Sequence, residues 1–203
     1  METEFKYRLS DNTVLDRIAD DARNNNQIKG DIDSIEMEAV YFDTEDQRLR
    51  DKGVAYRIRR ENDIMIATVK WDLDMVDGLY VREEINLVVN DENFAENPDI
   101  ELFKSSGAYD VLYEATGGRK LVKQVDMEYT RRQFLINTGS SLSCISEDFG
   151  TIHRKDKEDV PVFELEIELY HGDENDFRDL AARIREKYGL EVEPTSKLQR
   201  AFS

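Results

Sequence analysis

Several stretches of the sequence carry charged residues at every second position. The first is Glu2-Thr3-Glu4-Phe5-Lys6, and Glu164-Leu165-Glu166-Ile167-Glu168-Leu169 repeats the pattern late in the chain. Alternate residues of an extended strand point to the same face, so each stretch predicts a strand with one charged and one apolar face. Three like charges along a surface strand would repel one another and gain little. The repetition therefore favours charged faces that line an enclosed polar cavity.

Basic and mixed stripes recur in further segments that have strand composition. Guanidinium and ammonium groups bind phosphate oxygens. Carboxylates in the same cavity would repel a phosphate unless divalent cations lay between them, and all-oxygen ligation favours Mg²⁺ or Mn²⁺ over zinc. The combination indicates metal-assisted chemistry on a polyphosphate. These stripes contain Arg57 and Arg59, Lys70, Arg82 with Glu84 and Asn86, Arg131, and Lys197 with Arg200.

The composition is that of a folded protein with an acidic surface. A chain of 203 residues can bury a substantial core, and its three prolines and lack of a low-complexity linker predict a single domain over residues 1–203. The formal charge of −17 argues against nucleic acid or an anionic membrane as a partner. A homodimer is compatible with the sequence.

Cysteine content and hydropathy bear on the compartment. The lone Cys144 cannot form an internal disulfide, which predicts a reducing, cytoplasmic environment. No apolar stretch approaches the roughly 20 residues of a membrane-spanning helix. The charged residues Glu2 and Glu4 stand where a secretory signal would need basic and apolar regions, so we expect no such signal.

The hydrophobic periodicity predicts an α+β protein. Consecutive strands joined by short turns form an antiparallel sheet, and so many of them favour closure into a barrel with the helices packed outside. The charged faces would then line the interior, and the apolar faces would contact the helices. Strands are predicted at 1–9, 34–43, 54–61, 63–71, 79–89, 120–137, 141–147, 150–154 and 161–170, helices at 11–25, 91–106 and 174–188, and an extended tail up to residue 203.

The order of these motifs resembles that of the CYTH superfamily, the triphosphate tunnel metalloenzymes. The N-terminal Glu2-x-Glu4-x-Lys6 is similar to the ExExK signature of that family. Further matches follow in the family's order and span nearly the whole chain: Tyr41-Phe42-Asp43-Thr44, Gly53 before Arg57-x-Arg59, Thr68-Val69-Lys70, Arg82-x-Glu84, Tyr129-x-Arg131-x-x-Phe134, Asp148-x-Gly150, the acidic stripe from Glu164, and Ser196-Lys197.

The resemblance implies a closed, eight-stranded antiparallel tunnel that binds a triphosphate and hydrolyses it with Mg²⁺ or Mn²⁺. Turnover would depend most on Lys6, Glu4 and Glu166. The phosphates would be held by Lys6, Arg57, Arg59, Lys70, Arg82, Arg131 and Lys197, with Arg200 as a further contact. The metal-binding acids would be Glu2, Glu4, Asp148, Glu166 and Glu168, with Glu84 and Glu164 as additional candidates.

The family contains several activities. Because this short chain carries the tunnel motifs and little else, inorganic triphosphate is the leading substrate. Thiamine triphosphate would need an aromatic wall, for which Trp71 is a candidate. Class IV adenylate cyclases resemble a pattern with a His-Phe pair ahead of ExExK, which this sequence does not show. Outside enzymes, the alternative is a module that only binds polyphosphate, although such a module would not need metal-ligating carboxylates.

Overall fold

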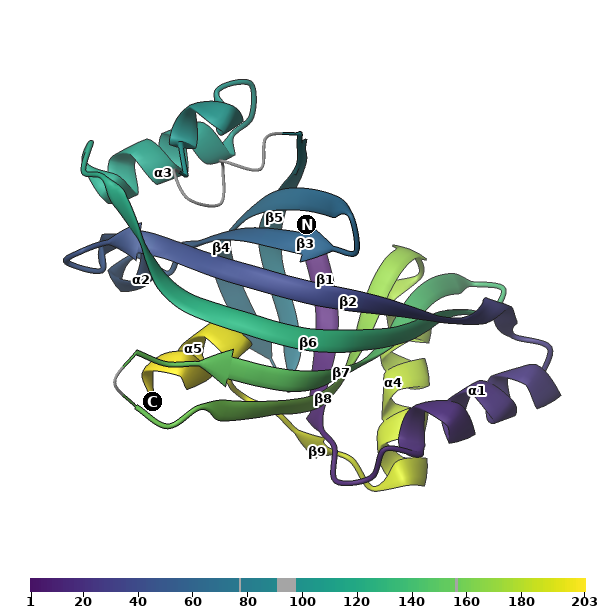
Figure 1. Cartoon of the computed structure of the whole chain (residues 1–203). Helices are drawn as coiled ribbons and strands as arrows, with labels where there is room; N and C mark the ends of the chain where they lie inside the picture. The colour runs from purple at the N-terminus through teal and green to yellow at the C-terminus, as the bar shows by residue number, and fades with distance from the viewer. Residues whose placement is uncertain (77, 91–97, 156) are drawn as a thin grey trace.

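The computed structural model describes residues 1–76, 78–90, 98–155 and 157–203, and its described strands form one antiparallel sheet (Figure 1). Long strands joined by short turns follow from the period-two patterns in the sequence. The strands are β1 (Glu2–Arg8), β2 (Ile28–Thr44), β3 (Ala55–Glu61), β4 (Ile64–Val76), β5 (Leu79–Val89), β6 (Leu121–Asn137), β7 (Ser141–His153), β8 (Val160–Gly172) and β9 (Glu191–Val192).

The first strand closes the sheet into a barrel. The strand order is β5-β4-β3-β2-β6-β7-β8-β1-β9, and β1 also pairs with β5. Strands β1 to β8 therefore form a closed ring, while β9 adds to β1 through the pair Tyr7 and Val192. The predicted closed, eight-stranded antiparallel barrel is confirmed. Closure satisfies the backbone hydrogen bonds of both sheet edges.

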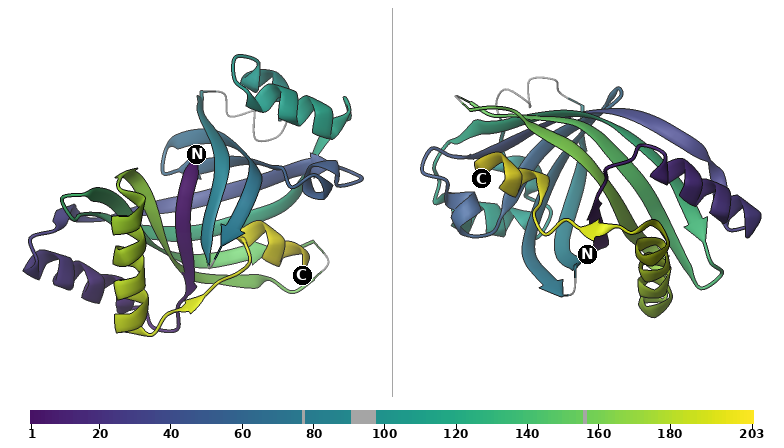
Figure 2. Two further views of the ribbon diagram at one scale, coloured as in Figure 1. Left: turned by 180° about the vertical axis from the view of Figure 1, so that it is seen from behind. Right: turned by 90° about the horizontal axis from the view of Figure 1, so that it is seen from below.

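Helices cover the outer face of the barrel on two sides (Figure 2). On one side, α1 (Val14–Asn24) and α4 (Glu174–Tyr188) pack on the apolar faces of β1, β6, β7 and β8. On the other, α2 (Arg48–Asp51), η2 (Ile100–Phe103) and α3 (Ala108–Thr116) cover β3 and β4. The strand β8 shows the principle: Leu165 and Ile167 are fully buried against α4, so its glutamates face inward. None of the described helices has the length and apolar character needed to cross a bilayer.

The C-terminal segment differs from the predicted extended tail. After β9 the chain forms helix α5 (Lys197–Phe202), which lies against the barrel strands in Figure 2. A capping box starts this helix: the Gln199 amide donates to the Ser196 hydroxyl at 3.1 Å, and the Ser196 amide donates to the Gln199 side chain at 2.8 Å. The prediction of an extended tail was wrong because this Ser-x-x-Gln signal was not used.

Two other predictions need correction. Of the helix predicted at 91–106, residues 91–97 lie outside the described residues, and the rest contains only η2. The next helix, α3, was not predicted. The two predicted strands at 141–147 and 150–154 are one strand, β7. Gly150 fits within it because a Cβ there would lie 2.1 Å from the backbone oxygen of Glu128 on β6, so the close approach requires glycine.

Candidate functional site

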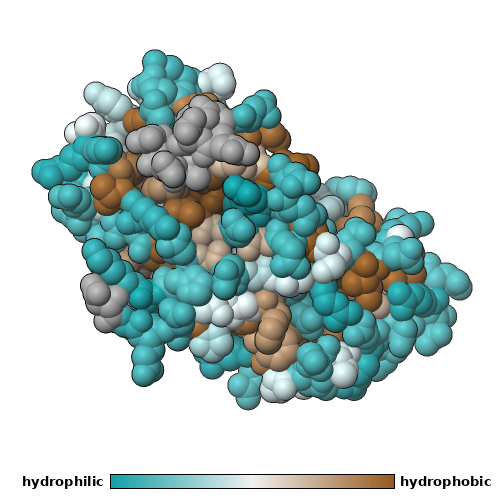
Figure 3. Space-filling model, in the orientation of Figure 1, coloured by the Kyte–Doolittle hydropathy of each residue, from teal (hydrophilic) through white to brown (hydrophobic). Residues whose placement is uncertain are grey.

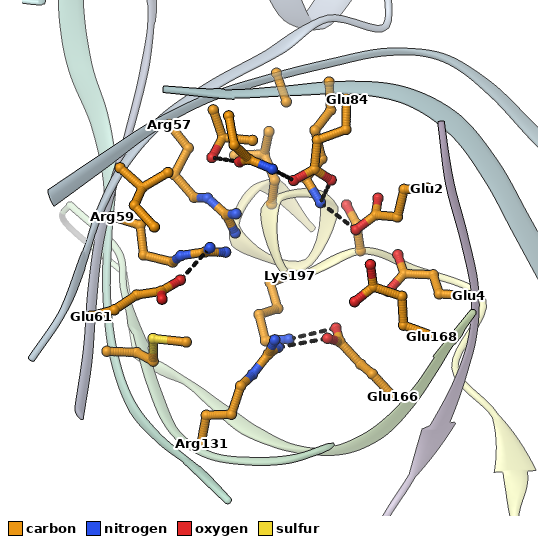
Figure 4. Close-up of a pocket in the computed structure, with 18 of the residues that line it drawn as sticks. Glu2, Glu4, Arg57, Arg59, Glu61, Glu84, Arg131, Glu166, Glu168 and Lys197 are labelled. Carbon is orange, nitrogen blue, oxygen red and sulfur yellow. Dashed lines mark hydrogen bonds and ion pairs between the residues drawn. The ribbon is translucent and has the colours of Figure 1, made fainter. Parts of the chain in front are cut away.

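The barrel encloses a cavity of about 410 Å³, and charged side chains from most of its strands point into it (Figure 4). Among the described residues, seven basic and six acidic side chains line it. The predicted site residues at this surface are Glu2, Glu4, Lys6, Arg57, Arg59, Lys70, Arg82, Glu84, Arg131, Glu166, Glu168 and Lys197. Asp148, Glu164 and Arg200 lie behind it.

Strand register places these groups opposite one another. On β1, Glu4 and Lys6 point into the cavity, while Tyr7 packs in the outer core. The antiparallel pairing sets Lys6 beside Glu166 and Glu4 beside Glu168. A register shift of one residue would turn every one of these side chains outward. The pattern of alternating charge in the sequence therefore encodes the charged interior.

One wall of the cavity is basic and consists of Arg57 and Arg59 on β3. The Arg57 side chain is 8% exposed, and its only hydrogen bond in the described structure joins Nη1 to the Tyr41 hydroxyl at 3.4 Å. Arg59 forms an ion pair with Glu61, but its buried Nε has no partner among the described residues. Burial, and then the neighbouring charge of Arg57, lower the pKa of Arg59. This wall carries positive charge that the protein leaves largely uncompensated.

The opposite wall is rich in carboxylates from β1, β5 and β8. Glu2 accepts from Lys70 Nζ at 2.7 Å and from Arg82 Nε at 2.5 Å. Glu4 forms ion pairs with Arg82 and, at 3.0 Å, with Lys6. Burial alone would raise the pKa of Glu2, but the charges of Lys70 and Arg82 outweigh it and hold that pKa far below its ordinary value. Glu2 is therefore ionised.

Glu168 differs from the other acids on this wall. It projects beside Glu2 and Glu4, and it forms no ion pair with any residue that the structure describes (Figure 4). Burial, followed by the negative charges of Glu2 and Glu4, raises the pKa of Glu168 to about 7. Three carboxylates thus converge here, and among the described residues the nearby bases form ion pairs with Glu2 and Glu4 but not with Glu168. Such a set of oxygen donors suits a divalent cation.

A third region surrounds Lys197, the first residue of α5. We call it the Lys197 cluster; it consists of Arg131, Asp148, Glu164, Glu166, Lys197 and Arg200. Arg131 grips Asp148 with two hydrogen bonds of 2.7 Å and also donates to Glu166 at 2.6 Å. Lys197 Nζ lies 2.7 Å from Asp148 and 2.9 Å from Glu166. It also pairs with Glu164, which in turn binds Arg200. Asp148, Glu164 and Arg200 are thus second-layer partners of the cavity residues.

Sequence reasoning did not identify several polar residues of the cavity. Glu61 follows Arg57 and Arg59 at the same period of two, so its inward position could have been found. Tyr41 and Tyr129 are buried and line the cavity, where Lys197 Nζ lies 5.4 Å from the Tyr129 ring centre. Both tyrosines belong to motifs that match the family, and Tyr129 lies two residues before Arg131 on the same face of β6, so its inward position could also have been found.

Comparison with known proteins points in one direction. Residues 1–202 match the CYTH domain family. An inorganic triphosphatase from Haemophilus influenzae is 25% identical over 163 residues, which make up 80% of this chain and 44% of that protein. The chain therefore spans less than half the length of this relative.

Solved structures share the fold at low sequence identity. A Hippeastrum protein assigned as an adenylyl cyclase and described as having a dominant triphosphatase activity aligns with 100% of this chain and 95% of its own, with a TM-score of 0.73 and 17% identity. A Bacillus halodurans protein assigned as an adenylate cyclase aligns over 100% and 98%, with a TM-score of 0.65 and 21% identity. The RNA triphosphatase domain of a mimivirus capping enzyme aligns over 90% and 87%, with a TM-score of 0.50 and 15% identity.

Proposed function

Because the chain belongs to the CYTH domain family, we propose that it hydrolyses a triphosphate, with inorganic triphosphate as the leading substrate, to diphosphate and phosphate. The inorganic triphosphatase of Haemophilus influenzae supports this choice of substrate. The cavity volume of about 410 Å³ lies within the range of roughly 300–1,000 Å³ common for small-molecule sites. The chain's formal charge of −17 disfavours a long polyanion such as RNA.

The observation that carries the proposal is the asymmetry of the cavity. Arg57 and Arg59 present guanidinium groups without sufficient carboxylate partners, and Glu168 faces them across the cavity without a basic partner among the described residues. Buried groups of this kind are costly unless a ligand compensates them. A triphosphate bound with a divalent cation offers both complements: phosphate oxygens for the arginines and a cation for the carboxylates.

The residues of the acidic wall fit a divalent cation. Glu2, Glu4 and Glu168 offer oxygen ligands only, which suits Mg²⁺ or Mn²⁺. When bound, such an ion would neutralise charge on phosphate oxygens and lower the pKa of a bound water. Glu84 has the same 2.7 Å contact with Lys70 Nζ as Glu2 has, and it remains an additional candidate ligand.

The basic residues of the chain would orient the substrate and stabilise developing charge. Arg57 and Arg59 project from β3 into the cavity, where their guanidinium forks can bind phosphate oxygens. Lys6 lies 3.0 Å from Glu4 and 3.8 Å from Glu166, which keeps its ammonium between the two acids at the wall of the cavity. We therefore propose that Lys6, Glu4 and Glu166 are the residues on which turnover most depends.

The direct test is phosphate release by the purified protein. Inorganic triphosphate, ATP and thiamine triphosphate would each be supplied with Mg²⁺, with Mn²⁺ and with chelator. We expect release from inorganic triphosphate that the chelator abolishes. Glu4→Gln should nearly abolish turnover, whereas Glu38→Gln, an exposed glutamate on β2, serves as the matched control and should behave like the wild type.

The same samples separate an enzyme from a binding module. If no triphosphate is hydrolysed but inorganic triphosphate raises the melting temperature, the protein is a polyphosphate-binding module instead. Full activity in Glu4→Gln would exclude the proposed site. Failure of both hydrolysis and stabilisation would exclude the substrate class altogether.

A second candidate substrate is an organic triphosphate such as thiamine triphosphate. A more apolar hollow of about 410 Å³ adjoins the tunnel and shares Lys70 and Arg82 with it. Its wall includes Trp71, which is half-buried and offers an aromatic ring beside these two bases. This position would suit a ring attached to the end of a triphosphate.

Trp71→Ala distinguishes the two substrates. If an organic group occupies the hollow, the variant should lose activity toward thiamine triphosphate and keep its activity toward inorganic triphosphate. Equal activity of wild type and variant toward thiamine triphosphate would remove this candidate.

A further inference from the structure

Three carboxylates near the tunnel have the arrangement of a metal site. Asp148, Glu164 and Glu166 each offer an oxygen, and these oxygens lie within 4.8 Å of one another. All three side chains are buried, and Asp148 and Glu164 are 0% exposed. By residue type and spacing alone, the group would be taken as ligands of a divalent cation, as the resemblance to the CYTH superfamily also implies, with Glu164 as an additional candidate.

The space between these carboxylates already contains a cation. Lys197 Nζ lies 2.7 Å from Asp148 Oδ2 and 2.9 Å from Glu166 Oε1, and it also contacts Glu164. These are the distances of charge-assisted hydrogen bonds. A metal ion bound by the same oxygens would have to displace the ammonium group.

The charges of the Lys197 cluster also balance. Arg131 binds Asp148 and Glu166, Lys197 binds all three acids, and Arg200 binds Glu164. Three bases therefore face three acids, and each of these acids has at least two basic partners. Glu168 on the same strand has no such partner among the described residues, which separates the cluster from the acidic wall.

The positions of Asp148 and Glu164 indicate what they do instead. Neither lines the tunnel cavity, whereas Lys197 does. Glu164 binds both Lys197 and Arg200, which lie on successive turns of α5. The two carboxylates thus fasten α5 to the barrel and fix the direction of the Lys197 ammonium.

We infer that Asp148 and Glu164 are positioning residues that hold Lys197 at the tunnel wall, and that they do not ligate the divalent cation. The inference rests on the proposed function, since Lys197 is taken as a phosphate-binding group. Its consequence is that loss of either carboxylate impairs the grip on triphosphate and leaves metal binding intact.

Two measurements test the inference on Asp148→Asn and Glu164→Gln. Manganese affinity is measured without substrate, from the electron paramagnetic resonance signal of free Mn²⁺, and KM and kcat are measured with inorganic triphosphate. We expect Mn²⁺ affinity within about twofold of wild type and a KM raised about tenfold or more. Glu168→Gln is the matched control on the same strand, and it should weaken Mn²⁺ binding by about tenfold or more.

A double-variant cycle separates positioning from a structural role. If Glu164 acts through Lys197, Glu164→Gln combined with Lys197→Met should raise KM no further than Lys197→Met alone. If instead the KM increase of the double variant equals the product of the two single-variant increases, the inference is overturned. If a carboxylate variant does not fold, Lys197→Met provides the test instead. Because Lys197 lies outside the proposed metal site, this variant should bind at least as many Mn²⁺ ions as wild type.

The results that would overturn this inference differ from the results that would overturn the proposed function. Weakening of Mn²⁺ binding by about tenfold in Asp148→Asn or Glu164→Gln would overturn the inference, whatever the substrate. If wild-type protein hydrolyses no triphosphate, the proposed function fails, but the Mn²⁺ titrations and the melting-temperature shift with inorganic triphosphate still decide the role of these carboxylates.

Discussion

Two groups of basic residues in the tunnel differ in how the protein compensates them. In the Lys197 cluster, each base has carboxylate partners, and Arg131 makes two hydrogen bonds of 2.7 Å to Asp148 alone. On β3, Arg57 is just as buried but has only a 3.4 Å hydrogen bond from its Nη1 to the Tyr41 hydroxyl in the described structure. Both groups come from neighbouring parts of one barrel, so burial alone does not explain the difference.

The difference separates bases whose direction the protein fixes from bases whose charge it leaves for a ligand to compensate. A buried base with carboxylate partners contributes to the folded state and is held in one position, as Lys197 is at the cavity wall. A buried base without them raises the free energy of the empty protein, and a bound anion removes that cost. Surface hydropathy does not show this distinction, because on the face drawn in Figure 3 hydrophilic residues predominate.

The largest expected effect concerns the compensated group. Arg131→Met would leave Asp148 and Glu166 with fewer partners inside the barrel. We expect the free energy of unfolding to fall by about 3–5 kcal/mol, as for other broken buried ion pairs. Urea denaturation without metal or triphosphate measures it, and a loss below about 1 kcal/mol would contradict the comparison.

The corresponding change in the uncompensated group should act on activity. Arg57→Met removes a guanidinium that has no carboxylate partner in the described structure. We expect kcat/KM for inorganic triphosphate to fall by about 10²–10³-fold, while the melting temperature stays the same or rises. If Arg57→Met unfolds as readily as Arg131→Met, the two groups are not different in kind.

Acid should weaken the ion pairs of the compensated group. Burial would raise the pKa values of Asp148 and Glu166, but Arg131 and Lys197 hold them below the ordinary values of 3.8 and 4.5. Groups with a lowered folded pKa stabilise the protein fully above their unfolded pKa, and that contribution is lost as the pH falls from the unfolded pKa through the folded pKa.

Stability should therefore decline as the pH falls below about 4.5 in the metal-free protein, by about 1.4 kcal/mol for each unit of pKa difference. Arg57→Met should keep this decline, since a guanidinium does not titrate there. The double variant Asp148→Asn and Lys197→Met should show a smaller one. Denaturation at a series of pH values measures all three proteins, and identical profiles would refute the assignment.

The smallest expected effect is that of a conservative change. Arg57→Lys keeps the charge but loses the planar fork that grips phosphate oxygens. We expect KM for inorganic triphosphate to rise about tenfold, with little change in the melting temperature. A KM equal to that of wild type would show that Arg57 acts as a point charge only.

Much of the fold could be predicted because charge and apolar residues alternate so regularly. Glu164, Glu166 and Glu168 on one face and Leu165 and Ile167 on the other fix the inward direction of β8, and the structure confirms the closed barrel. The structure places most of the predicted site residues at the cavity, although their roles stay predictions.

What could not be predicted depends on distances across the barrel. Nothing in the sequence says that Lys197 reaches Asp148 and Glu164, because α5 was taken as an extended tail. Periodicity predicts which face of a strand a side chain occupies, but not whether the side chain lines the cavity or lies behind the lining residues. Metal ligand and lysine partner therefore looked alike in the sequence.

The strand β1 pairs with a strand that is distant in the sequence and is therefore synthesised much later. Lys6 pairs with Glu166, so the ring cannot close until the ribosome has released β8. Until then the β8-facing edges of β7 and β1 have no partner strand, which favours association between nascent chains. We expect barrel closure to be a late and slow step of folding, dominated by long-range contacts. A chain that stops before β8 would hold neither the ligand nor the shape that binds it.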